Sequence, residues 1–197
     1  MFHDPETSLG IRVGTGLFQS SNTFDTTTHF STPTILGLVA GIRQQDIGLE
    51  LSVDWLKTNL KTGIKEGTLT SIPILLTAQL HPMWQEEGAF DPYIGIGGGY
   101  YINSFHPSSE AKEAQAADGI DDYDASVDDN VGLHLSAGAN MKISTVFAFT
   151  IDARYTFLSR TTVNAKGIAS GSPFSDSDSL KLNGFFFTIG AKYLFPE

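Results

Sequence analysis

The chain of 197 residues contains no cysteine, which excludes disulfide bonds, a thiolate nucleophile and cysteine-based metal sites. It also lacks a long apolar run. The longest one, at residues 35–42, falls far short of the ~18–20 residues that a membrane-spanning helix needs. A membrane-spanning strand needs only ~9–11 residues, of which every second one is apolar. Strands therefore remain as the only way in which this sequence could cross a membrane.

Basic residues are also scarce. The 12 lysines and arginines are outnumbered by 22 acidic residues, and the net charge of −10 argues against nucleic acid as a partner. Apolar residues make up 41% of the chain and the mean hydropathy is −0.04, values that a soluble protein would share. Composition alone thus does not identify the class, although the length suits a single domain over residues 1–197.

Apolar and polar residues alternate along eight segments, which is the pattern of β-strands with two different faces. In residues 147–158, one face carries Phe147, Phe149, Ile151, Ala153, Tyr155 and Phe157, and the other carries Ala148, Thr150, Asp152, Arg154, Thr156 and Leu158. The alternation is as clear in residues 9–18, 47–56, 72–81, 131–142 and 184–195. It is weaker in residues 34–43 and 93–104, which are rich in glycine and suit a strongly curved wall.

The connections between these segments alternate in length. Those at residues 44–46, 84–91 and 144–146 are short, and those at 19–33, 58–70, 105–130 and 159–181 are long. This arrangement predicts an all-β protein, an eight-stranded antiparallel up-and-down transmembrane β-barrel with long extracellular loops. A soluble barrel of the lipocalin kind, with its apolar face inside, is the alternative. Because so small a barrel has little interior room, its bulky apolar face fits better outside, against lipid.

Several stretches, in the same order along the chain, resemble the OmpW family of outer-membrane proteins. They are residues 46–51 (DIGLEL), 71–80 (SIPILLTAQL), 91–100 (DPYIGIGGGY), 152–155 (DARY) and 189–195 (IGAKYLF). The resemblance implies a bacterial outer-membrane protein in contact with the bilayer and lipopolysaccharide, present as a monomer or weak oligomer. Residues 1–7 have neither the basic start nor the apolar stretch of a secretory signal, so we expect that a signal was removed.

The same resemblance implies passive passage of small hydrophobic molecules, which enter from outside and leave sideways through the wall, with no chemistry and no cofactor. Residues at the upper ends of the polar faces predict an apolar pocket for such molecules; they are Phe18, Leu56, Leu75, Tyr101 and Leu158. Pro73 cannot donate a ladder hydrogen bond and is the candidate for a lateral opening. Simple interior packing explains these residues equally well.

Charged residues on the polar faces should point into the lumen, where they must pair or meet water. We expect a network of Arg12 and Arg154 with Glu50 and Asp152, which would plug the lower lumen. Arg43, Asp54 and Lys192 should also point inward. An ion pathway is the alternative interpretation of these charges.

Catalytic and metal sites are not indicated. His134 and Ser136 have the His-x-Ser spacing of barrel-borne lipid A deacylases, but Ala137 stands where those enzymes have asparagine, and the pair should face away from lipid. The acidic segment 118–130 lacks the spacing and closing glutamate of an EF-hand loop, so a solvated loop is favoured over weak divalent-ion binding. The serine and aspartate run at residues 175–179 is interpreted in the same way. A non-conducting barrel that anchors, adheres or binds a partner through these acidic loops is the alternative function.

Overall fold

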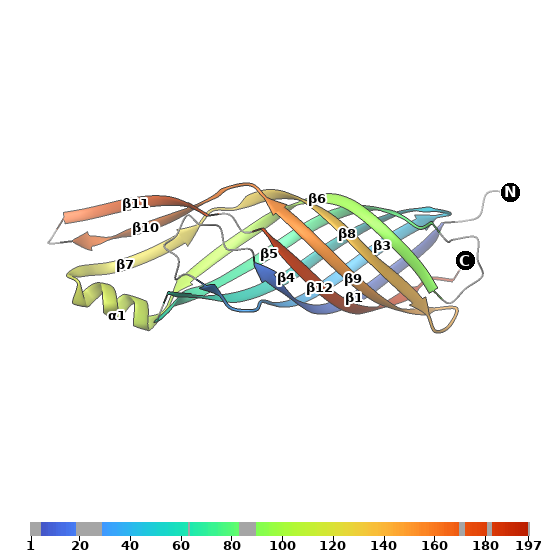
Figure 1. Cartoon of the computed structure of the whole chain (residues 1–197), viewed down its shortest axis with the longest axis horizontal. Coiled ribbons are helices and arrows are strands. Elements are labelled where there is room, and N and C mark those ends of the chain that lie inside the picture. The colour runs from blue at the N-terminus through green and yellow to red at the C-terminus, as the bar shows by residue number, and fades with distance from the viewer. Residues whose placement is uncertain are drawn as a thin grey trace.

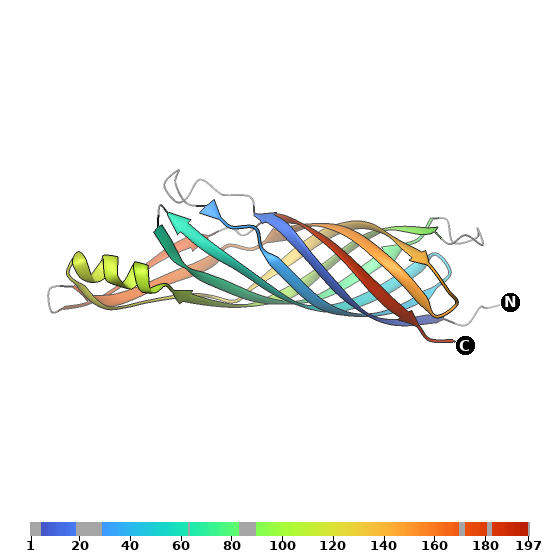
Figure 2. The same ribbon diagram turned by 90° about the horizontal axis from the view of Figure 1, so that it is seen from below.

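A computed structural model describes residues 5–18, 29–62, 64–82, 90–169, 172–180 and 183–196. Eight antiparallel strands form a closed barrel, in which each strand pairs with the next and the last pairs with the first (Figures 1 and 2). The strands are β1 (Glu6–Phe18), β3 (Thr34–Gln44), β4 (Ile47–Thr62), β5 (Ile64–Leu80), β6 (Phe90–Pro107), β8 (Asn130–Lys142), β9 (Phe147–Leu158) and β12 (Gly184–Leu194). All eight predicted strands are therefore confirmed.

The apolar face of each strand lies on the outside of the barrel. Leu133 and Ile47, for example, are 66% and 64% exposed, whereas the inward-facing Ser52 and His134 are 1% exposed. This orientation is the reverse of a soluble barrel and suits a wall that contacts lipid. It confirms the predicted transmembrane barrel and excludes the lipocalin-like alternative. No helix in the described part of the chain is long and apolar enough to span a membrane.

A folded extension projects from one end of the barrel, and both termini lie at the other end (Figures 1 and 2). It consists of α1 (Ser109–Ala117), β7 (Ile120–Val127), β10 (Thr161–Ala169) and β11 (Ser172–Leu180). The three strands form a separate sheet in the order β11-β10-β7. Since chain termini lie on the periplasmic side of such barrels, we call this part the extracellular extension. A short strand, β2 (His29–Phe30), pairs with the upper part of β4.

The long connections predicted at residues 58–70, 105–130 and 159–181 lie at the extracellular end, as expected, but they are largely folded into strands and a helix. β4 and β5 continue as a hairpin to Thr62 and Ile64, and the other two segments form the extracellular extension. Outside the lipid, both faces of a strand can be polar, so the alternation disappears although the ladder continues. The Thr68 hydroxyl, for example, donates to Asn59 Oδ1 at 2.9 Å in this region. Most of the predicted connections 19–33 and 84–91 lies outside the described residues.

Candidate functional site

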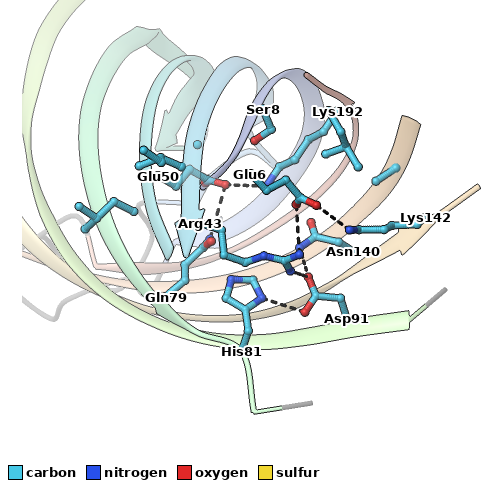
Figure 3. A pocket seen from close by; sticks show the side chains of 15 residues that line it. Glu6, Ser8, Arg43, Glu50, Gln79, His81, Asp91, Asn140, Lys142 and Lys192 are labelled. Atoms are coloured by element: carbon cyan, nitrogen blue, oxygen red, sulfur yellow. Dashed lines mark hydrogen bonds and ion pairs between the residues drawn. The ribbon is translucent and has the colours of Figure 1, made fainter. Parts of the chain in front are cut away.

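The lower end of the lumen is closed by a cluster of polar side chains (Figure 3), which we call the periplasmic cluster. Its members are Glu6, Arg43, His81, Asp91, Asn140 and Lys142. Asp91 lies at its centre and accepts from Arg43 at 2.5 Å, from His81 Nδ1 at 2.9 Å and from Asn140 at 3.0 Å. Figure 3 shows these side chains converging inside the ring of strands. Every charge of this cluster thus has a partner of opposite sign.

Asp54 is the centre of a second cluster, higher in the lumen. Arg12 donates to its two carboxylate oxygens at 2.8 and 2.5 Å, and to Ser52 at 2.9 Å. Arg12 also contacts Glu50 at 3.5 Å, and Glu50 accepts from Lys192 at 2.8 Å. All four charged side chains are less than 10% exposed. Buried charges are tolerated when they are paired and hydrogen-bonded in this way.

Arg154 and Asp152 complete this central cluster. Arg154 lies 3.8 Å from Asp54 and 3.5 Å from Asp152, and Asp152 accepts a hydrogen bond from the Tyr93 hydroxyl at 3.0 Å. The structure thus places the four residues of the predicted network, Arg12, Glu50, Asp152 and Arg154, in one cluster. Their strongest contacts, however, run through Asp54 and Lys192, which were expected only to face inward.

A small apolar chamber lies above the central cluster. Its walls are Ile35, Leu56, Pro73, Leu75, Tyr101, Thr156, Phe186 and Thr188, and its floor is Arg12, Asp54, Asp152 and Arg154. The cavity measures about 30 Å³, room for one or two water molecules. Three of the five predicted pocket residues, Leu56, Leu75 and Tyr101, line this upper chamber.

The other two, Phe18 and Leu158, belong to an apolar cluster at the extracellular mouth. Its centre is Leu69, which is 2% exposed, with Val127 beside it. Phe18, Phe30, Phe105, Leu158 and Val163 pack around them. This mouth cluster brings together barrel strands and the base of the extracellular extension, and its Phe18 contacts Phe186 of the upper chamber, with the ring centroids 5.6 Å apart. The residues predicted as one pocket are therefore divided between two adjoining groups of side chains.

The wall beside the chamber contains a gap in strand pairing. In the β4–β5 ladder, Val53 pairs with Ile74 and Leu56 pairs with Ser71, with no change of register. Two pairs lie between these positions, Asp54 with Pro73 and Trp55 with Ile72. Neither pair is joined in the ladder. Proline has no N–H to donate, which explains a break at this point.

Comparison with known proteins identifies the family. The model of the OmpW family matches residues 19–195. The chain belongs to the OmpW family. None of the curated proteins matches it in sequence.

Three solved outer-membrane barrels show the same fold as this OmpW-family chain. OprG from Pseudomonas aeruginosa has a TM-score of 0.73 at 19% identity, with 100% of this chain and 98% of that chain covered. E. coli outer membrane protein W has a TM-score of 0.53 at 22% identity, with 95% and 97% covered. Neisserial surface protein A has a TM-score of 0.64 at 11% identity, with 98% and 100% covered. This family member is thus a protein of the bacterial outer membrane.

His134 and Ser136 are both buried in the lumen of this OmpW-family barrel but are not joined to each other. The His134 Nε2 atom lies 2.8 Å from the Thr77 hydroxyl, and no hydrogen bond in the described residues joins His134 to Ser136. The arrangement that would activate a serine nucleophile is therefore missing from this pair. Among the described residues, no group of three or more histidine, aspartate or glutamate side chains is arranged to hold a metal ion.

Sequence reasoning missed Ile35 and Tyr93 as residues of the lumen, and it assigned Phe186 to the inward face without including it in the pocket. Tyr93 faces Gly138, and a Cβ atom on that glycine would lie 2.5 Å from the Tyr93 hydroxyl. Gly37 likewise faces Asp54, whose carboxylate fills the space of the missing side chain. The signal that could have identified such residues is a large side chain paired with a glycine on the neighbouring strand. This signal can be used only when the register between the two strands is known.

Proposed function

We propose that this protein gives small hydrophobic molecules passive passage across the outer membrane, with a lateral exit through the barrel wall. The observation that carries the proposal is the position of the apolar upper chamber directly against the pairing gap. Pro73 belongs to both, since it lines the chamber and lies opposite the skipped position of Asp54. The resemblance to the OmpW family implies the same class of molecule.

The floor of the chamber favours a sideways route over a straight one. Below it, the central and periplasmic clusters fill the lumen with paired charges, and the cavity between Glu50, Tyr93 and Lys192 measures only about 10 Å³. An apolar molecule that moved downward would have to separate buried ion pairs, at a cost of several kcal/mol for each ion left without its partner. A sideways movement meets the gap, where Trp55, Ile72 and Pro73 are apolar and Asp54 is the one charged side chain of the four.

The gap lowers the cost of opening the wall. A backbone group that loses its partner in the hydrocarbon region costs several kcal/mol, which is why barrels are normally sealed all round. At Pro73 one donor is missing and the ladder is already interrupted. Separation of β4 from β5 at this point therefore breaks fewer hydrogen bonds than elsewhere along the same pair.

Filling the chamber tests this proposal. We expect Leu75→Trp to reduce protein-dependent uptake of N-phenylnaphthylamine by intact cells at least about fivefold, because Leu75 is 2% exposed and lines the small cavity. The measurement is the fluorescence of the probe as it enters the membrane. Leu76→Trp is the matched control, since Leu76 lies on the lipid face and is 56% exposed. Equal uptake by both variants and the parent protein would contradict the chamber as a route.

A second candidate function, partner binding, is favoured by the folded and acidic extracellular extension. The hairpin β10–β11 pairs with β7 and with no barrel strand in the described residues, so it can be shortened independently. We expect replacement of residues 165–176 by an Asn-Gly turn to leave heat-dependent gel mobility and probe uptake undiminished. Loss of uptake from a barrel that still folds would show instead that the extension is needed for passage. If the shortened protein no longer makes cells adhere to a surface or a partner, while probe uptake is unchanged, the result would favour the partner-binding function.

A further inference from the structure

Arg154 differs from the other buried cations of the lumen, because it makes no hydrogen bond to the residues that the structure describes. Its side chain is 6% exposed, and its ion-pair contacts are long, at 3.8 Å to Asp54 and 3.5 Å to Asp152. Its Nε atom has no hydrogen-bond partner within the described part of the chain. Arg12, by contrast, makes four hydrogen bonds in the same cluster. A buried donor without an acceptor costs free energy of folding. The Arg154 Nε–H is therefore a position where an acceptor from outside the chain would be stabilised.

The neighbouring carboxylates are already engaged elsewhere. Asp54 accepts twice from Arg12, and Asp152 accepts from the Tyr93 hydroxyl. A second unpartnered group, the hydroxyl of Tyr101, lies in the same chamber and is also buried. Thr156 is within reach of that hydroxyl, but the geometry falls short of a hydrogen bond. The apolar chamber is therefore lined by two buried donors that no described side chain satisfies.

We infer that the upper chamber recognises a hydrogen-bond acceptor on an otherwise apolar molecule, a neutral ketone or ester. Its carbonyl oxygen accepts from the Arg154 Nε–H and from the Tyr101 hydroxyl, while its chain lies against Leu56, Leu75 and Pro73. This inference rests on the proposed passage of hydrophobic molecules and makes it more specific. It predicts that the protein discriminates between oxygenated molecules and plain hydrocarbons of the same length.

The charges of the central cluster, which include the chamber floor, exclude a carboxylate as the preferred group. Arg12, Arg154 and Lys192 balance Glu50, Asp54 and Asp152, so an anionic ligand would leave one buried charge without a counterpart. The size of the cavity, about 30 Å³, matches a carbonyl group in place of one or two waters. Displacement of such water is favourable when the ligand reproduces its hydrogen bonds. The rest of the molecule requires the mouth cluster or the gap to move.

The direct test follows the Arg154 Nε–Hε resonance by NMR in lipid nanodiscs, with assignment from its loss in Arg154→Lys. We expect 2-undecanone to shift this resonance and undecane, at the same concentration, to leave it in place. An absence of any shift at saturating 2-undecanone would overturn the inference, as would an equal shift with undecane. This measurement does not depend on transport.

Transport provides the second test. We expect Tyr101→Phe, which removes one donor without unpairing a charge, to lower uptake of 2-undecanone relative to undecane by about threefold to tenfold. Tyr100→Phe is the control, since Tyr100 faces outward and is 46% exposed. An unchanged ratio with both compounds still taken up would overturn the inference and leave the proposed passage intact. Uptake no faster than in cells without the protein would contradict the proposed passage, and the NMR shift alone would then decide the inference.

Discussion

A disulfide bond across the pairing gap should stop lateral passage, with uptake of N-phenylnaphthylamine falling at least about tenfold in oxidised cells. The pair Trp55→Cys and Ile72→Cys places one thiol on each side of the gap, on the lipid face, where Trp55 and Ile72 are 42% and 36% exposed. Opposed positions on adjacent strands lie within the span of a disulfide. Because the chain has no cysteine of its own, no other disulfide can form within it.

The control for this lock is a disulfide elsewhere in the same strand pair. Leu51 and Leu76 are partners in the ladder and both face lipid. The pair Leu51→Cys and Leu76→Cys joins β4 to β5 where hydrogen bonds already hold them, so uptake should be unaffected. A reducing agent should restore uptake in the gap variant within the same cells. Undiminished uptake with the gap disulfide formed would refute an exit at Pro73.

Removal of the Asp54 carboxylate should cause the largest loss of stability of any lumen substitution. Asp54→Ala leaves the buried guanidinium of Arg12 without its bidentate partner and takes one of two carboxylates from Arg154. The loss of one member of a buried ion pair costs about 3–5 kcal/mol. The free energy of unfolding in lipid vesicles, measured by urea titration, should fall by this amount.

Asp121→Ala is the matched comparison, since Asp121 lies in β7 and is exposed to solvent. Its removal should change the free energy of unfolding by less than about 0.5 kcal/mol. If Asp54→Ala were as small in effect as Asp121→Ala, the ion pairs of the central cluster would not stabilise the folded barrel.

The barrel strands could be predicted from the sequence because lipid imposes a strict requirement on every second residue. The segment 147–158, for example, alternates over its whole length and forms β9 as Phe147–Leu158. The extracellular extension could not be predicted in the same way. In β11, serine and aspartate alternate as two polar residue types, so neither face is apolar and periodicity gives no signal.

The residues of the site could be assigned to the lumen but not to their partners. Inward direction follows from position along a strand, which is why Arg12, Asp54 and Arg154 were expected to share one interior. The pairing of Arg12 with Asp54 depends on the stagger between strands, which brings Arg12 opposite Gly37 and Gly37 opposite Asp54. The absent side chain of Gly37 lets the guanidinium and the carboxylate meet, and no sequence pattern contains that relation.

The balance of charge inside the barrel has a consequence for what approaches it. Among the described residues, the lumen holds five cationic side chains and five anionic ones; they are Arg12, Arg43, Lys142, Arg154 and Lys192, and Glu6, Glu50, Asp54, Asp91 and Asp152. These ten charges cancel one another and so contribute nothing to the net charge of −10. Residues 108–129 and 159–180 alone contain ten acidic and three basic residues, a net charge of −7. The electrostatic potential around the mouth thus repels anions over a Debye length of about 8 Å at physiological salt, and it leaves uncharged solutes unhindered.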